Sequence, residues 1–171
     1  YQELYTVAAR VNIAVTVATI ANETCFNAND GAATFTVTNS TGYTPSLTVG
    51  TGSPVITGNT VSLTGLAPGN YTLQVEDTTT GCTSDVSFTI AEITTALDFT
   101  SIATNINCNV DTATITVTPT GGTPNYFYAV VPNTAGAPAV SAFGLSNQLT
   151  VYTNSGAIMQ WDVYVRDANG C

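Results

Sequence analysis

A domain-sized internal repeat constrains the fold of this chain more than any other feature of its sequence. The segment YTLQVEDTTTGC, residues 71–82, returns as WDVYVRDANGC, residues 161–171. The segment ATFTVT, residues 33–38, likewise returns as ATITVT, residues 113–118. The period is about 80–90 residues, which is the length of a small domain and about twice that of a solenoid repeat. The sequence therefore predicts two similar domains in tandem.

Each repeat consists of short segments in which every second residue is apolar, with Gly, Pro, Asn and Asp between them. A period of two is typical of half-buried β-strands, and no segment shows the 3.6-residue period of a helix over three turns. About six or seven short strands per repeat are typical of an immunoglobulin-like β-sandwich. We therefore predict an all-β fold of two tandem immunoglobulin-like β-sandwich repeats, residues 11–92 and residues 93–171. The strands predicted in the first repeat are residues 15–19, 33–38, 46–49, 60–63, 71–76 and 86–90.

The segment LAPGNY, residues 66–71, leads into one of these predicted strands. It resembles the tyrosine corner of such domains, in which a Tyr hydroxyl bonds to the backbone a few residues upstream. We therefore predict that Tyr71 and its counterpart Trp161 are core aromatic residues. The Thr-Pro pairs of the two repeats also align, Pro45 with Pro124.

The charged residues argue against several classes of function. The 171 residues include 11 carboxylates, two basic side chains and no His, for a formal net charge of −9. Such a chain repels phosphate groups and anionic lipid, and it has no apolar run of membrane-spanning length, so we expect no nucleic-acid partner and no membrane insertion. It also lacks the usual general base, and no nucleophile–base pair is evident. We therefore expect a protein that is not an enzyme.

Four cysteines lie at corresponding places, two in each repeat. Four cysteines allow three connectivities, and the duplication favours one disulfide in each repeat, Cys25–Cys82 and Cys108–Cys171. A zinc site is the alternative, but these cysteines lack the close C-x₂-C pairing of zinc ligands. Disulfides imply an oxidising compartment, so we expect an extracellular or cell-surface location.

Together these motifs resemble the SprB-type repeat, which giant cell-surface adhesins of gliding Bacteroidetes-type bacteria carry in tandem. The first repeat has Asn-x-x-Cys at residues 22–25 and Gly-Leu-x-Pro-Gly-x-Tyr at residues 65–71. The second has Asn-x-x-Cys at residues 105–108 but departs from the pattern at residues 133–160, which replace the Leu-x-Pro-Gly turn. The resemblance implies type IX secretion and a structural or adhesive role in a surface filament linked to gliding motility. It supplies no catalytic residue.

Residues 1–10 parallel the closing strand of the first repeat, with Tyr5 aligned with Phe88. The second repeat stops at its Gly-Cys turn without such a strand. We therefore predict that residues 1–10 close a preceding repeat or act as a donor strand. The slot in the second repeat would be filled by an equivalent strand, from the continuing chain or from another copy. The predicted contact residues are Leu4, Tyr5, Val7, Trp161, Val163 and Val165.

Two functional classes remain open. The first is a non-catalytic structural and adhesive module, whose partners are neighbouring repeats or copies of itself, a surface polysaccharide or another cell-surface protein. The second is a carbohydrate- or protein-binding sandwich with an exposed aromatic face. The densest aromatic segment favours residues 126–128 for that face. Strand alternation directs Tyr126 and Tyr128 to one side and Phe127 to the other, so we expect at least one side to be partly exposed.

Polar turn residues are weaker candidates. Asn27, Asn29 and Asp30 could contribute to a Ca²⁺ site, and Asp77 and Asp167 recur before the Gly-Cys motifs. Calcium needs six to eight oxygen ligands and no D-x-D-x-D-G loop is present, so we expect ordinary turn residues and no cofactor.

Two threonines resemble O-glycan acceptors of this bacterial group, because each follows an Asp. They are Thr78 and Thr112. Three Asn-x-Ser/Thr sequons, at Asn22, Asn39 and Asn70, arise easily by chance in a Thr-rich chain.

Overall fold

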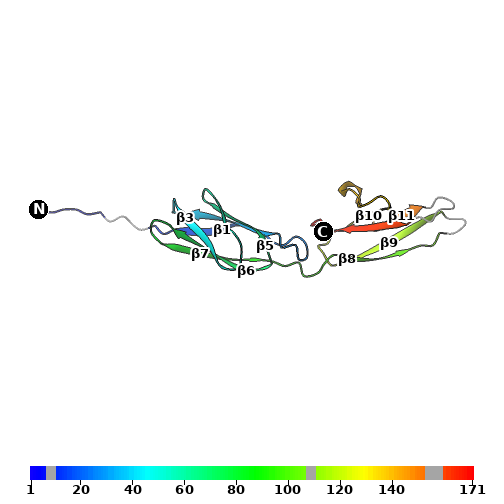
Figure 1. The fold of residues 1–171 in the computed structure, drawn as a ribbon, viewed down its shortest axis with the longest axis horizontal. Helices are drawn as coiled ribbons and strands as arrows, with labels where there is room; N and C mark the ends of the chain where they lie inside the picture. Colours follow the sequence, from blue (N-terminus) through cyan, green and yellow to red (C-terminus); the bar gives the residue numbers. More distant parts are fainter. Residues whose placement is uncertain (7–10, 107–110, 153–159) are drawn as a thin grey trace. The chain divides into compact units, whose positions relative to one another are not determined.

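The computed structural model describes residues 1–6, 11–106, 111–152 and 160–171 (Figure 1). Apart from a single-turn 3₁₀ helix at Val140–Ala142, the regular secondary structure of these residues is β-strand. The predicted all-β class is therefore confirmed.

Two compact units make up the chain. Unit 1 contains Tyr1–Glu23 and Asn27–Glu92, and unit 2 contains Thr24–Phe26 and Ile93–Cys171. The short segment Thr24–Phe26 thus belongs to unit 2, although it lies within the first repeat of the sequence. This assignment was not predicted, and the segment contains Cys25, whose disulfide is described below.

Unit 1 contains two antiparallel sheets. Their strand orders are β1-β2-β5-β4 and β3-β6-β7. The strands are β1 (Ala14–Ala21), β2 (Gly31–Thr38), β3 (Tyr43–Val49), β4 (Val55–Thr57), β5 (Thr60–Leu66), β6 (Gly69–Asp77) and β7 (Thr83–Ile90). Figure 1 shows these strands in blue to green.

The core of unit 1 lies between the two sheets. Phe35 of β2 is fully buried, and its ring meets that of Phe88 of β7 edge-on at a centroid distance of 5.0 Å. The Phe88 ring in turn stacks on Tyr71 of β6 at 5.2 Å. Because β2 belongs to one sheet and β6 and β7 to the other, the apolar faces of the sheets meet, as in a β-sandwich. The arrangement is compatible with the predicted immunoglobulin-like architecture.

Tyr71 forms the hydrogen bond that the sequence predicts for a tyrosine corner. Its hydroxyl donates to the carbonyl oxygen of Ala67 over 2.7 Å, while the ring is buried. The bond satisfies the polar end of a core aromatic residue and holds the turn that leads into β6.

Unit 2 has smaller sheets with the same local order. One is β11-β9-β8, which matches β5-β2-β1 of unit 1, and the other is β10-β12, which matches β3-β6. The strands are β8 (Asp98–Ala103), β9 (Thr112–Thr120), β10 (Phe127–Pro132), β11 (Gln148–Tyr152) and β12 (Trp161–Arg166). In the described part of unit 2, no strand corresponds to β7.

All six strands predicted for the first repeat lie within observed strands. The short edge strand β4 was not predicted, because Val55 and Ile56 are both exposed and show no alternation.

The register of the strands changes one alignment. Pro45 lies opposite Val75 in unit 1, and Tyr128 lies opposite Val165 in unit 2. Pro45 therefore corresponds to Tyr128, and its alignment with Pro124 is wrong in structural terms. Pro124 lies four residues before Tyr128, so the Thr-Pro pair of the second repeat precedes β10, whereas Thr44 and Pro45 lie within β3.

Candidate functional site

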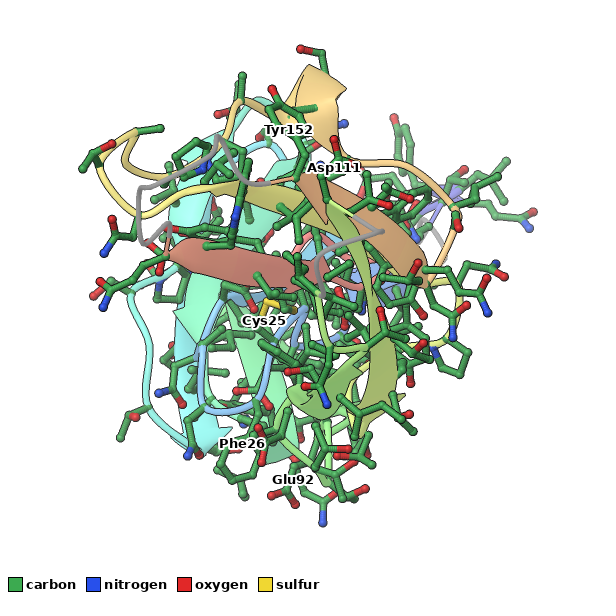
Figure 2. All side chains as sticks on the ribbon, turned by 90° about the vertical axis from the view of Figure 1, so that its right-hand side faces the viewer. Cys25, Phe26, Glu92, Asp111 and Tyr152 are labelled. Carbon is green, nitrogen blue, oxygen red and sulfur yellow. A yellow bond between two sulfur atoms is a disulfide. The ribbon has the colours of Figure 1, made fainter. Side chains whose placement is uncertain are left out.

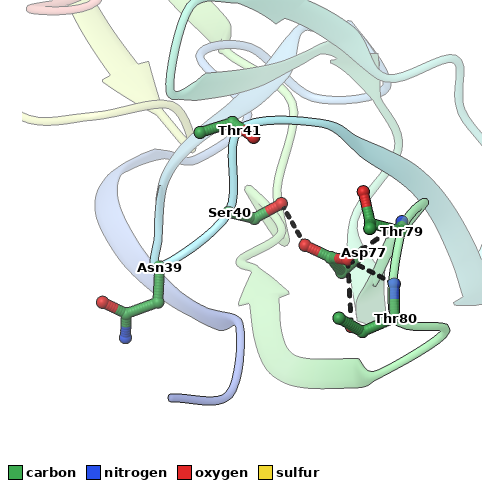
Figure 3. Close-up of a pocket in the computed structure, with 6 residues that line it drawn as sticks. All are labelled: Asn39, Ser40, Thr41, Asp77, Thr79 and Thr80. Carbon is green, nitrogen blue, oxygen red and sulfur yellow. Dashed lines mark hydrogen bonds between the residues drawn. The ribbon is translucent and has the colours of Figure 1, made fainter. Parts of the chain in front are cut away.

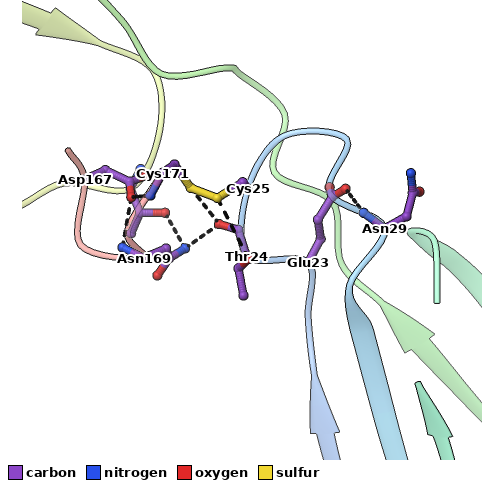
Figure 4. The surroundings of a disulfide bond; sticks show 8 residues. Glu23, Thr24, Cys25, Asn29, Asp167, Asn169 and Cys171 are labelled. Carbon is purple, nitrogen blue, oxygen red and sulfur yellow. Dashed lines mark hydrogen bonds between the residues drawn. A yellow bond between two sulfur atoms is a disulfide. The ribbon is translucent and has the colours of Figure 1, made fainter. Parts of the chain in front are cut away.

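A disulfide in unit 2 joins Cys25 and Cys171, with Sγ atoms 2.02 Å apart and Cα atoms 5.8 Å apart (Figures 2 and 4). The predicted pairs Cys25–Cys82 and Cys108–Cys171 are therefore both wrong, since a sulfur forms one disulfide. The physical reason is that Cys25 packs with unit 2, whereas Cys82 lies in unit 1 and packs against its core. Cys108 lies outside the described residues.

The turn that carries Cys171, residues Asp167–Cys171, is organised by a buried carboxylate. We call it the Asp167 turn. Oδ1 of Asp167 accepts hydrogen bonds from the backbone N–H groups of Asn169 and Cys171, each over 3.0 Å. Oδ2 accepts from the N–H of Thr123 over 2.8 Å. The side chain is 2% exposed, so the three bonds satisfy a carboxylate that has left water.

Thr24–Phe26 docks on the Asp167 turn through a hydrogen bond as well as the disulfide (Figure 4). The side-chain amide of Asn169 donates to the carbonyl oxygen of Thr24 over 2.9 Å and to the hydroxyl of Thr123 over 3.0 Å. The turn therefore acts as a receptor for a cysteine-bearing segment from elsewhere in the chain. Asn169 was not singled out from the sequence, because its acceptor on Thr24 is a backbone atom.

Unit 1 contains a closely similar turn, Asp77–Cys82, which we call the Asp77 turn (Figure 3). Oδ1 of Asp77 accepts from the N–H groups of Thr79 (3.0 Å) and Thr80 (2.7 Å) and from the Thr80 hydroxyl (2.9 Å). Oδ2 accepts from the Ser40 hydroxyl over 2.6 Å. A pocket opens beside this turn. It is lined by Asn39, Ser40, Thr41, Asp77, Thr79 and Thr80.

These hydrogen bonds hold the pKa of Asp77 at about 2, below its ordinary value of 3.8. The bond from Ser40 contributes most, followed by those from the N–H and hydroxyl of Thr80, while burial acts in the opposite direction. All of the donors favour the ionised carboxylate, so ionised Asp77 stabilises the turn.

We predict that unit 1 loses stability as the pH falls from about 4 to about 2. The folded pKa of Asp77 lies below its unfolded value, so the stabilisation is complete above pH 4. It is lost as the carboxylate becomes protonated. Urea unfolding across this range should show a steeper loss for the wild type than for Asp77→Asn. Asp85→Asn, at an exposed position of β7, is the control with the same charge change and should keep the wild-type slope. Equal slopes for the wild type and Asp77→Asn would contradict the prediction.

The edge of β12 is the second candidate site. In unit 1, β6 has β3 on one side and β7 on the other, and its inward residues Tyr71, Leu73 and Val75 are at most 5% exposed. In unit 2, β12 pairs with β10 alone among the described strands. All residues of β12 are half-buried. They include Trp161, Val163 and Val165, which are the counterparts of Tyr71, Leu73 and Val75.

The other predicted contact residues lie near the first residue of the chain. Residues 1–6 contain no strand, and Leu4 and Tyr5 are 92% and 80% exposed. Val7 lies outside the described residues. Leu4 and Tyr5 are therefore solvent-exposed in the structure, and their contact with β12 stays a prediction.

The two tyrosines of the predicted aromatic segment, residues 126–128, pack against the core of unit 2, and Phe127 on the other side is partly exposed, as expected. Tyr128 is buried, and Tyr126 packs against the same core while its hydroxyl donates to the carbonyl oxygen of Gly121 over 2.6 Å. Phe127, on the opposite side of β10, is half-buried. The alternation of these residues was predicted correctly, but the side with two tyrosines faces the core because β10 packs against β9 and β11 through it.

The polar turn residues Asn27 and Asn29 contribute to the backbone conformation and hydrogen bonding of their turn. Asn27 and Asn29 adopt positive φ angles, which Asn tolerates in turns, and the N–H of Asn29 donates to Glu23 over 3.1 Å. Among the described residues, no group of three or more His, Cys, Asp or Glu side chains could hold a metal ion. Thr78 and Thr112 are exposed, and their glycosylation stays a prediction.

The family model of the SprB repeat matches residues 100–135, which include β9 and β10, and this confirms the resemblance seen in the motifs. It describes a structural repeat of cell-surface proteins and not an enzyme family. No curated protein matches the chain. In the described part of the chain, no helix is long and apolar enough to cross a membrane.

Proposed function

We propose that this chain is a non-catalytic structural module of a secreted cell-surface adhesin, and that its repeats are joined end to end by strand completion. The module spaces and presents binding surfaces outside the cell. The observation that carries the proposal is the edge of β12, where a strand equivalent to β7 is lacking among the described residues. Type IX secretion and a part in gliding motility belong to the same proposal and are supported by the SprB repeat match.

Unit 1 indicates what a strand beside β12 would contribute. There β7 covers β6, with Phe88 opposite Tyr71 and both rings buried. Full burial of one such aromatic side chain stabilises a fold by about 1.5–3 kcal/mol. An uncovered edge also leaves backbone N–H and C=O groups without strand partners. Completion of β12 would therefore stabilise unit 2 considerably.

The segment Leu4–Ala8 has the composition of the strand that is needed. The register of β6 and β7, transferred to unit 2, places Tyr5 opposite Trp161 and Glu3 opposite Val163. Tyr5 would then take the place of Phe88. Because Leu4 and Tyr5 are exposed in the structure, they are accessible to a neighbouring repeat.

A titration with the peptide YQELYTVAAR, residues 1–10, tests strand completion in the full chain. Trp161 is the single tryptophan of the sequence, so its fluorescence reports directly on the edge of β12. We expect a saturable shift of the Trp161 emission to shorter wavelength and slower amide exchange in Trp161–Arg166.

A peptide with Tyr5→Asp is the matched control and should bind at least tenfold more weakly, because it would bury a charge beside Trp161. Equal effects of the two peptides, or no change in either measurement, would contradict strand completion. Antibodies against the chain should also label intact cells that produce it, and labelling confined to permeabilised cells would contradict a surface location.

A further inference from the structure

We propose that the face of β10 and β12 that points away from the core binds an acidic saccharide, with the sugar carboxylate on Arg166 and the pyranose ring over Phe127 and Tyr164. We call this surface the outer face. The inference rests on the proposed function and deepens it, because it names one surface that the module presents and the chemistry of its ligand. It is carried by a guanidinium and a hydroxyl that have no partner among the described residues.

The register of β10 and β12 places these side chains together. Phe127 lies directly opposite Arg166, and Ala129 lies opposite Tyr164. Side chains of directly opposite residues share a face, as do those of every second residue along a strand. Tyr128 points to the other side and packs in the core of unit 2. Phe127, Tyr164 and Arg166 therefore lie on the outer face, and since the small Ala129 is buried, the larger side chains form its exposed part.

The polar groups of this face are available to a ligand. Arg166 has the one basic side chain in the described part of the sequence, because Arg10 lies outside it. Its guanidinium makes no hydrogen bond or ion pair there, although the sequence contains 11 carboxylates. The hydroxyl of Tyr164 also has no partner among the described residues. A guanidinium without a counter-ion, with five N–H donors, indicates an anionic ligand.

The guanidinium lies beside the Asp167 turn. A Cβ atom added at Gly170 would be 2.7 Å from Nη2 of Arg166, so the head group packs against the backbone of this turn. Both carboxylate oxygens of Asp167 accept from backbone N–H groups, and they do not pair with Arg166. Because the turn is fixed, binding requires little further ordering of the arginine. Its planar fork of N–H groups matches the two oxygens of a carboxylate.

The rest of the outer face indicates a saccharide and not an acidic peptide. The half-buried rings of Phe127 and Tyr164 lie beside the guanidinium and offer apolar surface to the C–H groups of a pyranose. Asp162 lies at the other end of β12, about 13 Å from Arg166 along the strand. Its carboxylate would accept hydrogen bonds from sugar hydroxyls and would repel a second carboxylate. The face therefore fits a short saccharide with one carboxylate.

Titration of the full chain with cellobiouronate, a disaccharide of glucuronate and glucose, tests the proposal. Cellobiose is the matched control ligand, because it differs only in having a hydroxymethyl group in place of the carboxylate. We expect saturable shifts of the backbone amide NMR signals of β10 and β12. The Kd for cellobiouronate should be about tenfold lower than that for cellobiose, because a hydrogen-bonded charge pair is lost with the neutral sugar. The peptide acetyl-Glu-Gly-Gly-amide, which has one carboxylate and no sugar ring, should also bind about tenfold more weakly than cellobiouronate.

Four variants assign the contacts. Arg166→Gln should abolish the preference for cellobiouronate over cellobiose. Tyr164→Phe and Phe127→Ala should weaken the binding of both sugars alike. Thr100→Ala, at an exposed position of β8, is the control and should leave both Kd values unchanged.

The preference between the two sugars is measured on the wild type, so it stays decisive if Arg166→Gln fails to fold. Equal binding of both sugars, tighter binding of the peptide, shifts confined to other strands or no shifts at all would overturn the proposal. These titrations contain no donor-strand peptide, and Trp161 lies on the opposite side of β12 from Tyr164. Failure of the saccharide site is therefore distinguishable from failure of strand completion.

Discussion

Replacing Cys171 with serine should lower the free energy of unfolding by about 2–5 kcal/mol. The disulfide joins residues that are 146 positions apart, and for a loop of about this length the chain-entropy model gives about 5 kcal/mol. The native state loses the covalent link as well, while the hydrogen bond from the Asn169 amide to the carbonyl oxygen of Thr24 is retained on the Asp167 turn. Guanidinium unfolding of the oxidised chain and of the variant measures the difference.

The matched controls are Cys25→Ser and the double variant with Cys171→Ser. All three remove the same bond, so their losses should agree within about 0.5 kcal/mol and should not add. Cys82→Ser should leave the Cys25–Cys171 peptide intact in a non-reduced digest. A Cys25–Cys82 peptide from the wild type, or additive losses in the double variant, would contradict the assignment.

Truncation of Phe35 should be the most damaging single change in unit 1. Phe35 of β2 is fully buried, and its ring meets Phe88 edge-on at 5.0 Å between the sheets. Phe35→Ala removes these contacts and leaves a cavity that the two β-sheets cannot close without moving toward each other. Such changes cost about 3–5 kcal/mol. Chemical denaturation followed by circular dichroism provides the measurement.

Ile56→Ala, in β4 of the same sheet, is the control. Ile56 is 46% exposed, so its truncation should cost about 0.5 kcal/mol or less. A loss below about 1.5 kcal/mol for Phe35→Ala would indicate that the two sheets of unit 1 do not pack through this residue. Phe35→Leu should recover more than half of the loss, because it restores most of the apolar volume.

The strands and the corner were predictable because their signals are local. The alternation in segments such as residues 33–38 reports which side chains share a face, and the paired strands follow it. The Leu-Ala-Pro-Gly-Asn-Tyr segment likewise predicts its own hydrogen bond, from Tyr71 to Ala67, over four residues. The edge strand β4 was not predicted, because a strand whose residues are all exposed does not show the alternation of apolar and polar residues.

The candidate sites were predictable in part. The recurrence of Asp77 and Asp167 before the Gly-Cys motifs indicated both turns. The sequence did not show that these carboxylates bind the loops before β3 and β10. Nor did it show which side of β10 is buried, since alternation groups Tyr126 with Tyr128 but does not say which group faces the core.

The sequence by itself determined the duplication, the all-β class and most of the strand positions, because period-two alternation and turn residues act over a few neighbours. The partner of each cysteine was decided by the tertiary structure alone. A disulfide requires Cα atoms within about 7 Å, and the 5.8 Å between Cys25 and Cys171 arises because a three-residue segment leaves its own repeat for unit 2. The side-chain amide of Asn169 donates a hydrogen bond to the backbone carbonyl of Thr24 in this segment. Because every residue has a backbone carbonyl, this acceptor cannot be recognised from the sequence.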